Sequence, residues 1–292
     1  MHAIQLQAKG RPAILVEDRS VPALPKDCLL VKTVAVSLNP YDLLDIYPPW
    51  SLSDPGDVLG CDYAGIVEEV GVDVTRDFKK GAAYWGTFAE YIVVVADVQV
   101  HVPEAISMED AAALGVTVLT TGAVLYDTLS LPMLPAIDES RRQILVYGGS
   151  TSMGRMVIQF ARLSNLEIIT TCSPNNFDLV ESLGADHIFD YNDPPRQQPS
   201  AQSHRADLDF RFCMGVLYFN ASFSLQGQIM EGPLEKFSSA VKFAKLAEQL
   251  FAEGKIMMHP KEVRAGALAG VLDGLQELED KKVRGKKLVY LV

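Results

Sequence analysis

A glycine-rich segment of this chain lies between two apolar runs of different spacing. Gln143–Tyr147 (QILVY) is typical of a buried strand, residues 148–154 (GGSTSMG) hold three glycines, and residues 156–163 (MVIQFARL) have helical spacing. Glycines at such a turn let the backbone approach a pyrophosphate, and the start of the helix supplies amide donors and a positive dipole end. The segment is not a complete G-x-G-x-x-G and has no P-loop lysine. It indicates either a dinucleotide site or a tight turn of purely structural use.

A second polar turn follows the next apolar run, residues 167–172 (EIITTC). Sites for NAD carry an Asp or Glu roughly 20 residues beyond the glycine turn, where it binds the ribose 2′-hydroxyl. Here the turn consists of Ser173, Pro174, Asn175 and Asn176, and none of them is acidic. Such residues leave room for a 2′-phosphate without charge repulsion, so we expect NADPH as the cofactor. An ordinary turn after a strand is the alternative.

The strands and the helix that position these two turns are expected to belong to a parallel sheet. Strand, glycine turn, helix and second strand make a βαβ unit of a doubly wound sheet, which predicts an α/β fold. A further helix and strand are expected at residues 177–183 and 187–189. After them, residues 192–205 predict a polar, proline-rich loop, and residues 235–253 and 287–292 predict a long helix and a final strand.

The first part of the chain has a different pattern. Short runs rich in β-branched residues, separated by Gly and Pro, occur at residues 28–38, 64–71 and 87–101. Such runs predict a small β-rich unit that ends near residue 105. Ser107, followed by Glu109 and Asp110, then resembles the cap of a helix, and a second helix is expected over residues 121–129.

Length, composition and charge limit the possible functions. The 292 residues suggest about two domains, with 48% apolar and 22% charged residues, as in a globular protein. A net charge of −11 repels nucleic acids and anionic lipid surfaces. The apolar stretch 111–126 is shorter than a membrane span of about 20 residues, and residues 1–17 alternate in polarity, unlike a secretion signal. We expect a cytoplasmic protein that binds neither nucleic acid nor membranes.

Cysteine and histidine residues are dispersed along the chain. None has metal-ligand spacing, and there is no C-x-x-C. A G-x-S-x-G elbow and an H-E-x-x-H motif are also missing. We therefore expect reduced thiols, no metal site and no hydrolase chemistry. The residues concerned are Cys28, Cys61, Cys172, Cys213, His2, His101, His187, His204 and His259.

Three further motifs carry a family resemblance. Residues 37–42 (SLNPYD), 59–65 (LGCDYAG) and 87–91 (TFAEY) occur in the order found in the medium-chain dehydrogenase/reductase superfamily. The resemblance implies a GroES-like β-rich catalytic domain followed by a Rossmann cofactor domain and a C-terminal return to the first domain. Zinc-dependent members carry a Cys and a His where this chain has Asn39 and Cys61 or its neighbour, so the chain is similar to the zinc-independent branch. The implied domains are residues 1–118, 119–255 and 256–292.

Within that branch, the two turns resemble those of the trans-acting enoyl reductases of fungal highly reducing polyketide synthases. The matching residues are 146–151 (VYGGST) and 171–179 (TCSPNNFDL), and residues 285–289 (GKKLV) also fit. This resemblance implies transfer of a hydride from NADPH to the β-carbon of an α,β-unsaturated thioester on an acyl carrier protein, then protonation at the α-carbon. It implies a polyketide synthase as partner, and we expect a monomer. No side chain is assigned as the catalytic acid.

The resemblance also implies a set of cofactor-binding residues and a set of substrate-binding residues. Alternatively, Tyr191 is an ordinary aromatic residue at a strand end, and residues 120–127 are simply a core helix. At Leu44 the family often has a lysine. The implied cofactor-binding residues are Tyr41, Asp42, Leu43, Leu44, Ser150, Thr151, Ser152, Met153, Ser173, Pro174, Asn175, Asn176, Tyr191, Val283 and Arg284. The implied substrate-binding residues are Thr120, Thr121, Gly122, Ala123, Val124, Leu125, Tyr126, Asp127, Gly215, Val216, Leu217, Tyr218 and Phe219.

Two segments of the chain are shorter than in the family. They lie between residues 74 and 88 and between about residues 195 and 213, where the second half of the Rossmann sheet is expected. We therefore expect a truncated Rossmann sheet, with the apolar run 210–223 (FRFCMGVLYFNASF) adding a strand or packing across the exposed face. Two other functions stay open: a quinone or enone oxidoreductase of the same branch, and a degenerate, non-catalytic product of a truncated gene.

Overall fold

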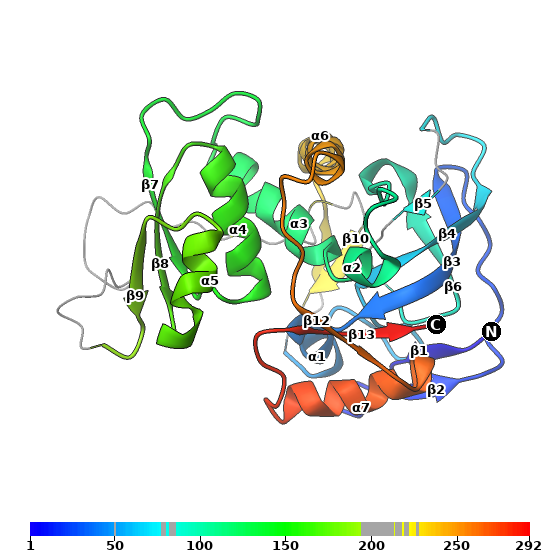
Figure 1. Cartoon of the computed structure of the whole chain (residues 1–292). Coiled ribbons are helices and arrows are strands. Elements are labelled where there is room, and N and C mark those ends of the chain that lie inside the picture. Colours follow the sequence, from blue (N-terminus) through cyan, green and yellow to red (C-terminus); the bar gives the residue numbers. More distant parts are fainter. Residues whose placement is uncertain are drawn as a thin grey trace. The chain divides into compact units, whose positions relative to one another are not determined.

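The chain forms two compact units. A computed structural model describes residues 1–49, 51–76, 80–81, 86–193, 213, 218, 222–225 and 228–292. Contacts between residues separate a first compact unit, Met1–Val116 with Leu217–Val292, from a second compact unit, Thr117–Val216. Each unit has its own sheet (Figure 1).

The first compact unit is built on a six-stranded sheet. Its order is β12-β13-β3-β4-β5, and β6 also pairs with β3. Strand β13 runs antiparallel to β3, so the end of the chain completes a sheet begun by residues far upstream (Figure 1). The strands are β3 (Cys28–Ser37), β4 (Asp62–Val70), β5 (Lys80–Gly81), β6 (Tyr91–Val95), β12 (Lys261–Arg264) and β13 (Lys287–Leu291).

Helices and a small second sheet cover one side of this core. Helix α7 (Ala267–Glu279) packs on β13, on α1 (Pro40–Ile46) and on the β1-β2 pair (Ala3–Gln5 and Ile14–Val16). The core between them is apolar, with Leu29, Val31, Val36, Tyr63, Phe88, Val271 and Leu288 buried. Helix α1 was not expected from the sequence, although Pro40 at its first position fits a helix start.

A short helix follows β6 in the first compact unit. Helix α2 (Met108–Ala112) begins after Ser107, whose Oγ accepts a hydrogen bond from the Asp110 amide at 3.1 Å, which confirms the expected cap. Its alanines pack against Ala35, Ala64 and Val289 of the sheet. The expected helix over residues 121–129 begins earlier, as α3 (Gly115–Gly122), and continues as a π-helical turn, η2 (Ala123–Thr128).

The second compact unit holds the βαβ arrangement predicted from the sequence. Strands β7 (Gln143–Tyr147), β8 (Glu167–Cys172) and β9 (His187–Asp190) run parallel in that order. Helix α4 (Ser152–Leu163) packs on β7 and β8, and α5 (Phe177–Ser182) packs on β9 (Figure 1). Within the described part of the chain this sheet has three strands, which confirms the expected parallel α/β sheet.

Helix α6 (Leu234–Ala252) belongs to the first compact unit, whereas the sequence-based division placed residues 119–255 together. The physical reason is a set of long-range contacts. Glu248 Oε2 of α6 accepts hydrogen bonds from Arg76 Nη2 at 3.0 Å and from the His101 amide at 2.9 Å.

The apolar run 210–223 is described only at residues 213, 218, 222 and 223. The last two begin β10 (Ser222–Leu225), which pairs with β11 (Gln228–Glu231) in a separate antiparallel hairpin. The described end of the run thus adds no strand to the parallel sheet. No helix in the described part of the chain is both long enough and apolar enough to span a bilayer.

Candidate functional site

The carboxyl ends of the parallel strands bring three predicted cofactor segments to one edge of the sheet. Residues 148–151 follow β7, residues 173–176 follow β8, and Tyr191 follows β9. The first segment is tied to β8 just before the second segment begins, because the amides of Gly148 and Gly149 donate to Thr171 Oγ1 and to the Thr171 carbonyl at 3.1 and 2.9 Å. This edge is where open α/β sheets bind their ligands.

The glycine turn is packed so tightly that two of its positions exclude a side chain. A Cβ atom on Gly154 would lie 2.4 Å from the Gly148 carbonyl oxygen, and one on Gly149 would lie 2.1 Å from Thr170 Oγ1. Gly148 has a φ of +79°, a conformation that favours glycine. Helix α4 can therefore start directly against the end of β7, as a dinucleotide site requires.

The first turn of α4 offers donors at this edge. Thr151 is the N-cap, and its Oγ1 accepts a hydrogen bond from the Gly154 amide at 3.0 Å. The amides of Ser152 and Met153, the first two helical residues, donate to no other described group. Both side chains are half-buried. The two amides and the helix dipole suit a pyrophosphate.

The turn after β8 carries no acid. Residues 174–176 form a 3₁₀ turn, and Asn176 Nδ2 donates to Ser173 Oγ at 2.8 Å. Pro174 and Asn175 are exposed. A carboxylate does stand at the end of the neighbouring strand, because Asp190 pairs in register with Cys172, but Asp190 Oδ1 accepts from the amide and the side chain of Asn192.

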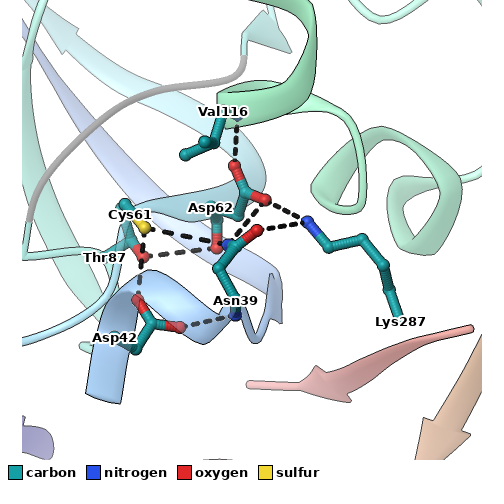
Figure 2. A network of polar contacts seen from close by, with 7 residues as sticks. All are labelled: Asn39, Asp42, Cys61, Asp62, Thr87, Val116 and Lys287. Carbon is teal, nitrogen blue, oxygen red and sulfur yellow. Dashed lines mark hydrogen bonds and ion pairs between the residues drawn. The ribbon is translucent and has the colours of Figure 1, made fainter. Parts of the chain in front are cut away.

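A second group of polar side chains lies buried in the first compact unit (Figure 2). Lys287 Nζ donates to Asp62 Oδ2 at 2.5 Å and to Asn39 Oδ1 at 2.9 Å, and Asn39 Nδ2 donates to Asp62 Oδ2 at 2.9 Å. Asp62 Oδ1 accepts from the Val116 amide at 2.7 Å. Thr87 Oγ1 donates to the Asp62 carbonyl. All these side chains except that of Val116 are buried.

The sheet order explains why these residues meet. Strands β13, β3 and β4 are neighbours, and Ser37 at the end of β3 pairs with Val289 and with Asp62. Asn39 follows that strand end, whereas Lys287 and Asp62 begin the two flanking strands. The three side chains therefore converge at one end of the sheet.

Asp42 and Cys61 extend the buried group. Asp42 Oδ2 accepts from the Asn39 amide at 2.7 Å, which closes the start of α1, and Cys61 Sγ donates to Asp42 Oδ1 at 3.2 Å. Burial raises the pKa of Asp42 to about 7. Burial and the carboxylates of Asp42 and Asp62 hold the pKa of the Cys61 thiol well above its usual range, so the thiol keeps its proton.

This donor set does not fit a zinc ion. Zinc needs deprotonated ligands, usually four in a tetrahedron. Here the Lys287 ammonium already contacts Asp62, the Cys61 thiol is protonated, and Asn39 offers an amide. In the described ranges no three His, Cys, Asp or Glu side chains are grouped to hold a metal ion. Metal independence remains a prediction.

The other predicted cofactor residues lie in the first compact unit. Asp42 is enclosed in the buried group, and both of its carboxylate oxygens accept hydrogen bonds. Leu43 packs against the core, and Leu44 is 47% exposed. Val283 also packs against the core, whereas Arg284 is exposed. The pairing of these residues with a cofactor stays a prediction.

The predicted substrate segment, residues 120–127, is mostly interior. Thr121, Gly122, Ala123, Leu125 and Tyr126 are buried, and Tyr126 Oη lies 2.9 Å from Ser164 Oγ. Within this segment, Thr120, Val124 and Asp127 are half-buried. These three are the members of the segment that a substrate could reach.

The second predicted substrate segment falls almost wholly outside the described residues. Gly215, Val216, Leu217 and Phe219 are not described. Tyr218 is buried, with Lys236 Nζ 3.2 Å from its Oη and 4.7 Å from its ring centre.

Comparison with known proteins identifies the family. Residues 25–104 match the alcohol dehydrogenase GroES-like domain. A trans-enoyl reductase of Aspergillus sclerotiorum, resD, is 36% identical, and the match covers all of both chains. The trans-enoyl reductase ACTTS2 of Alternaria alternata is 33% identical over 99% of this chain and 98% of its own. This chain belongs to the trans-enoyl reductase family. The resemblance to that family and the GroES-like and Rossmann architecture expected from the sequence are thus confirmed.

Solved structures show the same fold. A mycobacterial quinone oxidoreductase, Rv154c, has a TM-score of 0.71 and 20% identity, with both chains fully covered. A mycobacterial structure of Rv1454c complexed with NADPH has a TM-score of 0.68 and 21% identity, and both chains are again fully covered. At these identities the likeness shows a shared fold.

The family alignment also shows that this chain is short. Its alignment with the Aspergillus relative spans 362 positions against 292 residues here, so about 70 positions (362 − 292 = 70) have no counterpart. The three strands of the described parallel sheet agree with the loss of part of the cofactor domain.

Two functional candidates escaped the sequence-based prediction. Lys287 appeared only within a matching C-terminal motif, and Asp62 only as a neighbour of Cys61. The structure joins them in one buried ion pair. A sequence signal for the pair does exist: one acid and one lysine each stand at the start of an apolar strand. A charge buried there needs a partner of opposite charge.

Proposed function

We propose that this protein is a trans-acting enoyl reductase that uses NADPH to reduce α,β-unsaturated thioesters of a growing polyketide. The observation that carries the proposal is the shared sheet edge, where a tight glycine turn with amide donors meets an acid-free turn. Membership of the trans-enoyl reductase family supports the reaction class. The polyketide synthase that carries the thioester is the proposed partner.

The proposed cofactor contacts follow from the geometry of that edge. The amides of Ser152 and Met153 would donate to the pyrophosphate, and the Thr151 cap fixes the turn that presents them. Ser173 and Asn176 would face the 2′-phosphate. The cofactor, when bound, supplies the hydride. The remaining proposed cofactor residues are Tyr41, Asp42, Leu43, Leu44, Ser150, Pro174, Asn175, Tyr191, Val283 and Arg284.

The proposed substrate contacts are residues 120–127 and 215–219. Thr120, Val124 and Asp127 are the accessible members of their segment, and their half-buried surface suits an acyl chain ending in a polar thioester. Reduction places negative charge on the thioester oxygen, so a hydrogen-bond donor there would accelerate the reaction. No side chain is assigned that role.

The shortened cofactor domain favours a second candidate, a non-catalytic member of the same family. An open parallel sheet that lacks part of its strands loses one wall of its ligand crevice. The unmatched alignment positions and the three described strands support this alternative.

Thermal unfolding with NADPH, followed by a substrate panel, separates these functions. Tight binding raises the unfolding midpoint by mass action, and a hundredfold excess over Kd corresponds to about 2.7 kcal/mol. We expect a clear shift with NADPH and reduction of a crotonyl thioester. Turnover of quinones but not thioesters would favour a quinone or enone reductase. If NADPH causes no shift and no substrate is turned over, the result would favour the non-catalytic alternative.

A further inference from the structure

The buried ion pair of Asp62 and Lys287 is costly in free energy. The carboxylate is fully buried and the lysine side chain is 4% exposed. Taking two charges out of water costs several kcal/mol per ion, and apolar residues of similar size often give equal or greater stability. Fold stability alone is therefore a weak reason for a charged pair here. What its atoms contact suggests another reason.

Each carboxylate oxygen of Asp62 accepts a hydrogen bond from a group at the start of a helix. Oδ1 accepts from the Val116 amide in the first turn of α3, where a negative charge also interacts favourably with the helix dipole. Oδ2 accepts from Asn39 Nδ2, and Asn39 is the N-cap of α1. One carboxylate thus fixes the first turns of two helices.

Lys287 closes the arrangement from the C-terminal strand. Its ammonium group contacts Asp62 Oδ2 and Asn39 Oδ1 together, so it fixes the orientation of the Asn39 amide (Figure 2). With that orientation, Asn39 Nδ2 must point to Asp62. The lysine therefore determines the partners of both polar atoms of the Asn39 side chain: Oδ1 accepts from Lys287, and Nδ2 donates to Asp62.

The two helices that start here lead into the proposed binding segments. Helix α1 begins with Pro40 and carries residues 41–44 of the proposed cofactor site. Helix α3 runs on into the π-helical turn Ala123–Thr128, within the proposed substrate segment. Single π-helical turns are frequent at functional sites.

We propose that Asp62 and Lys287 are a pair of positioning residues that set the starts of α1 and α3 and thereby hold in place the proposed binding segment that each of these helices leads into. The proposal rests on the proposed function in naming those segments. It assigns the pair no contact with cofactor or substrate. It predicts that removing both charges restores folding but not catalysis.

The test uses Lys287→Met, Asp62→Asn and the double variant, in the full chain. Lys287→Met leaves a buried, unpaired carboxylate, so its unfolding midpoint should fall steeply. The double variant carries no unpaired charge, and its midpoint should recover most of that loss. Its kcat with NADPH and crotonyl thioester should nevertheless stay at least tenfold below that of the unaltered protein.

Lys261→Met is the matched control. Lys261 on β12 lies opposite Lys287 in the sheet register. Its ammonium group makes its own ion pair, at 2.5 Å, with Asp110 of α2, and both side chains of that ion pair are only partly buried. The same substitution there should leave kcat within twofold.

Hydrogen exchange separates failure of this proposal from failure of the proposed function. In the double variant, amides of residues 115–118 should exchange at least tenfold faster than in the unaltered protein, whatever the activity. If kcat recovers together with the midpoint, or if exchange over residues 115–118 is unchanged, the positioning role is refuted. If the unaltered protein binds no NADPH and reduces no thioester, the proposed function fails, and the exchange result alone decides the role of the pair.

Discussion

Gly149 and Thr170 approach each other so closely that a Cβ atom on the glycine would lie 2.1 Å from the threonine Oγ1. That hydroxyl cannot turn away freely, because it donates to the Val146 carbonyl oxygen at 2.7 Å. The glycine turn is thus held against the centre of the sheet by one side chain of β8.

Gly149→Ala should therefore destabilise the protein and weaken NADPH binding. Overpacking of this kind typically costs about 1–3 kcal/mol, and displacement of the turn should raise the Kd for NADPH at least tenfold. Urea unfolding and a fluorescence titration with NADPH measure the two effects. Adding Thr170→Ala removes the clashing Oγ1, so the double variant should recover part of both losses. Equal Kd values for the unaltered protein and Gly149→Ala would contradict this account of the turn.

Ser173→Asp should reduce the preference for NADPH. The substitution places an anion in the acid-free turn, where it repels a 2′-phosphate and can accept from a 2′-hydroxyl. We expect the Kd for NADPH to rise at least tenfold while that for NADH changes little or falls. Ser182→Asp, at the end of α5, is the control for added charge. If the unaltered protein binds NADH as tightly as NADPH, the interpretation of this turn is wrong.

Asp42 should make stability depend on pH. Burial raises its pKa in the folded protein to about 7, above the usual value near 3.9, although the Asn39 amide, the Cys61 thiol and Lys287 oppose the rise and Asp62 adds to it. The folded state thus binds the proton more tightly. The stability from this group is full below about pH 4 and is lost as the pH rises through about 7.

Asp42→Asn tests that pH dependence. Asparagine keeps an acceptor for the Asn39 amide but does not titrate, so the difference in free energy of unfolding between the two proteins should change with pH between 4 and 8. The full change is on the order of 4 kcal/mol for a shift of this size. Urea unfolding at several pH values measures it. Parallel pH profiles for the two proteins would show that Asp42 titrates normally.

Metal removal should leave the protein unchanged. Near Asn39, Cys61 and Asp62, the candidate zinc ligands, the Lys287 ammonium group already contacts the Asp62 carboxylate, and the Cys61 thiol keeps its proton. Elemental analysis after dialysis against a chelator should find far less than one zinc per chain, and the unfolding midpoint should be the same before and after dialysis. Stoichiometric zinc that survives the chelator would overturn this prediction.

Local signals in the sequence were enough to predict the parallel βαβ unit. The runs at residues 143–147 and 167–172 became β7 and β8 with the same bounds. Their apolar, β-branched composition and the glycines between them are short-range features, and each favours the same local structure. The Ser107 cap follows from short-range chemistry in the same way, because its acceptor and donor are three residues apart. Family membership likewise followed from contiguous motifs.

Tertiary structure alone decided which distant residues meet. Asp62 and Lys287 are 225 positions apart and become partners only because β13 adds to β3, which pairs with β4. Likewise, α6 joins the first compact unit through Glu248, which lies 172 positions from Arg76. Neither pairing leaves a periodic pattern, because register and strand order depend on the whole sheet and its helices. The sequence alone was therefore enough to predict the glycine turn and the acid-free turn, whereas the buried charge pair depends on the order in which the strands pack.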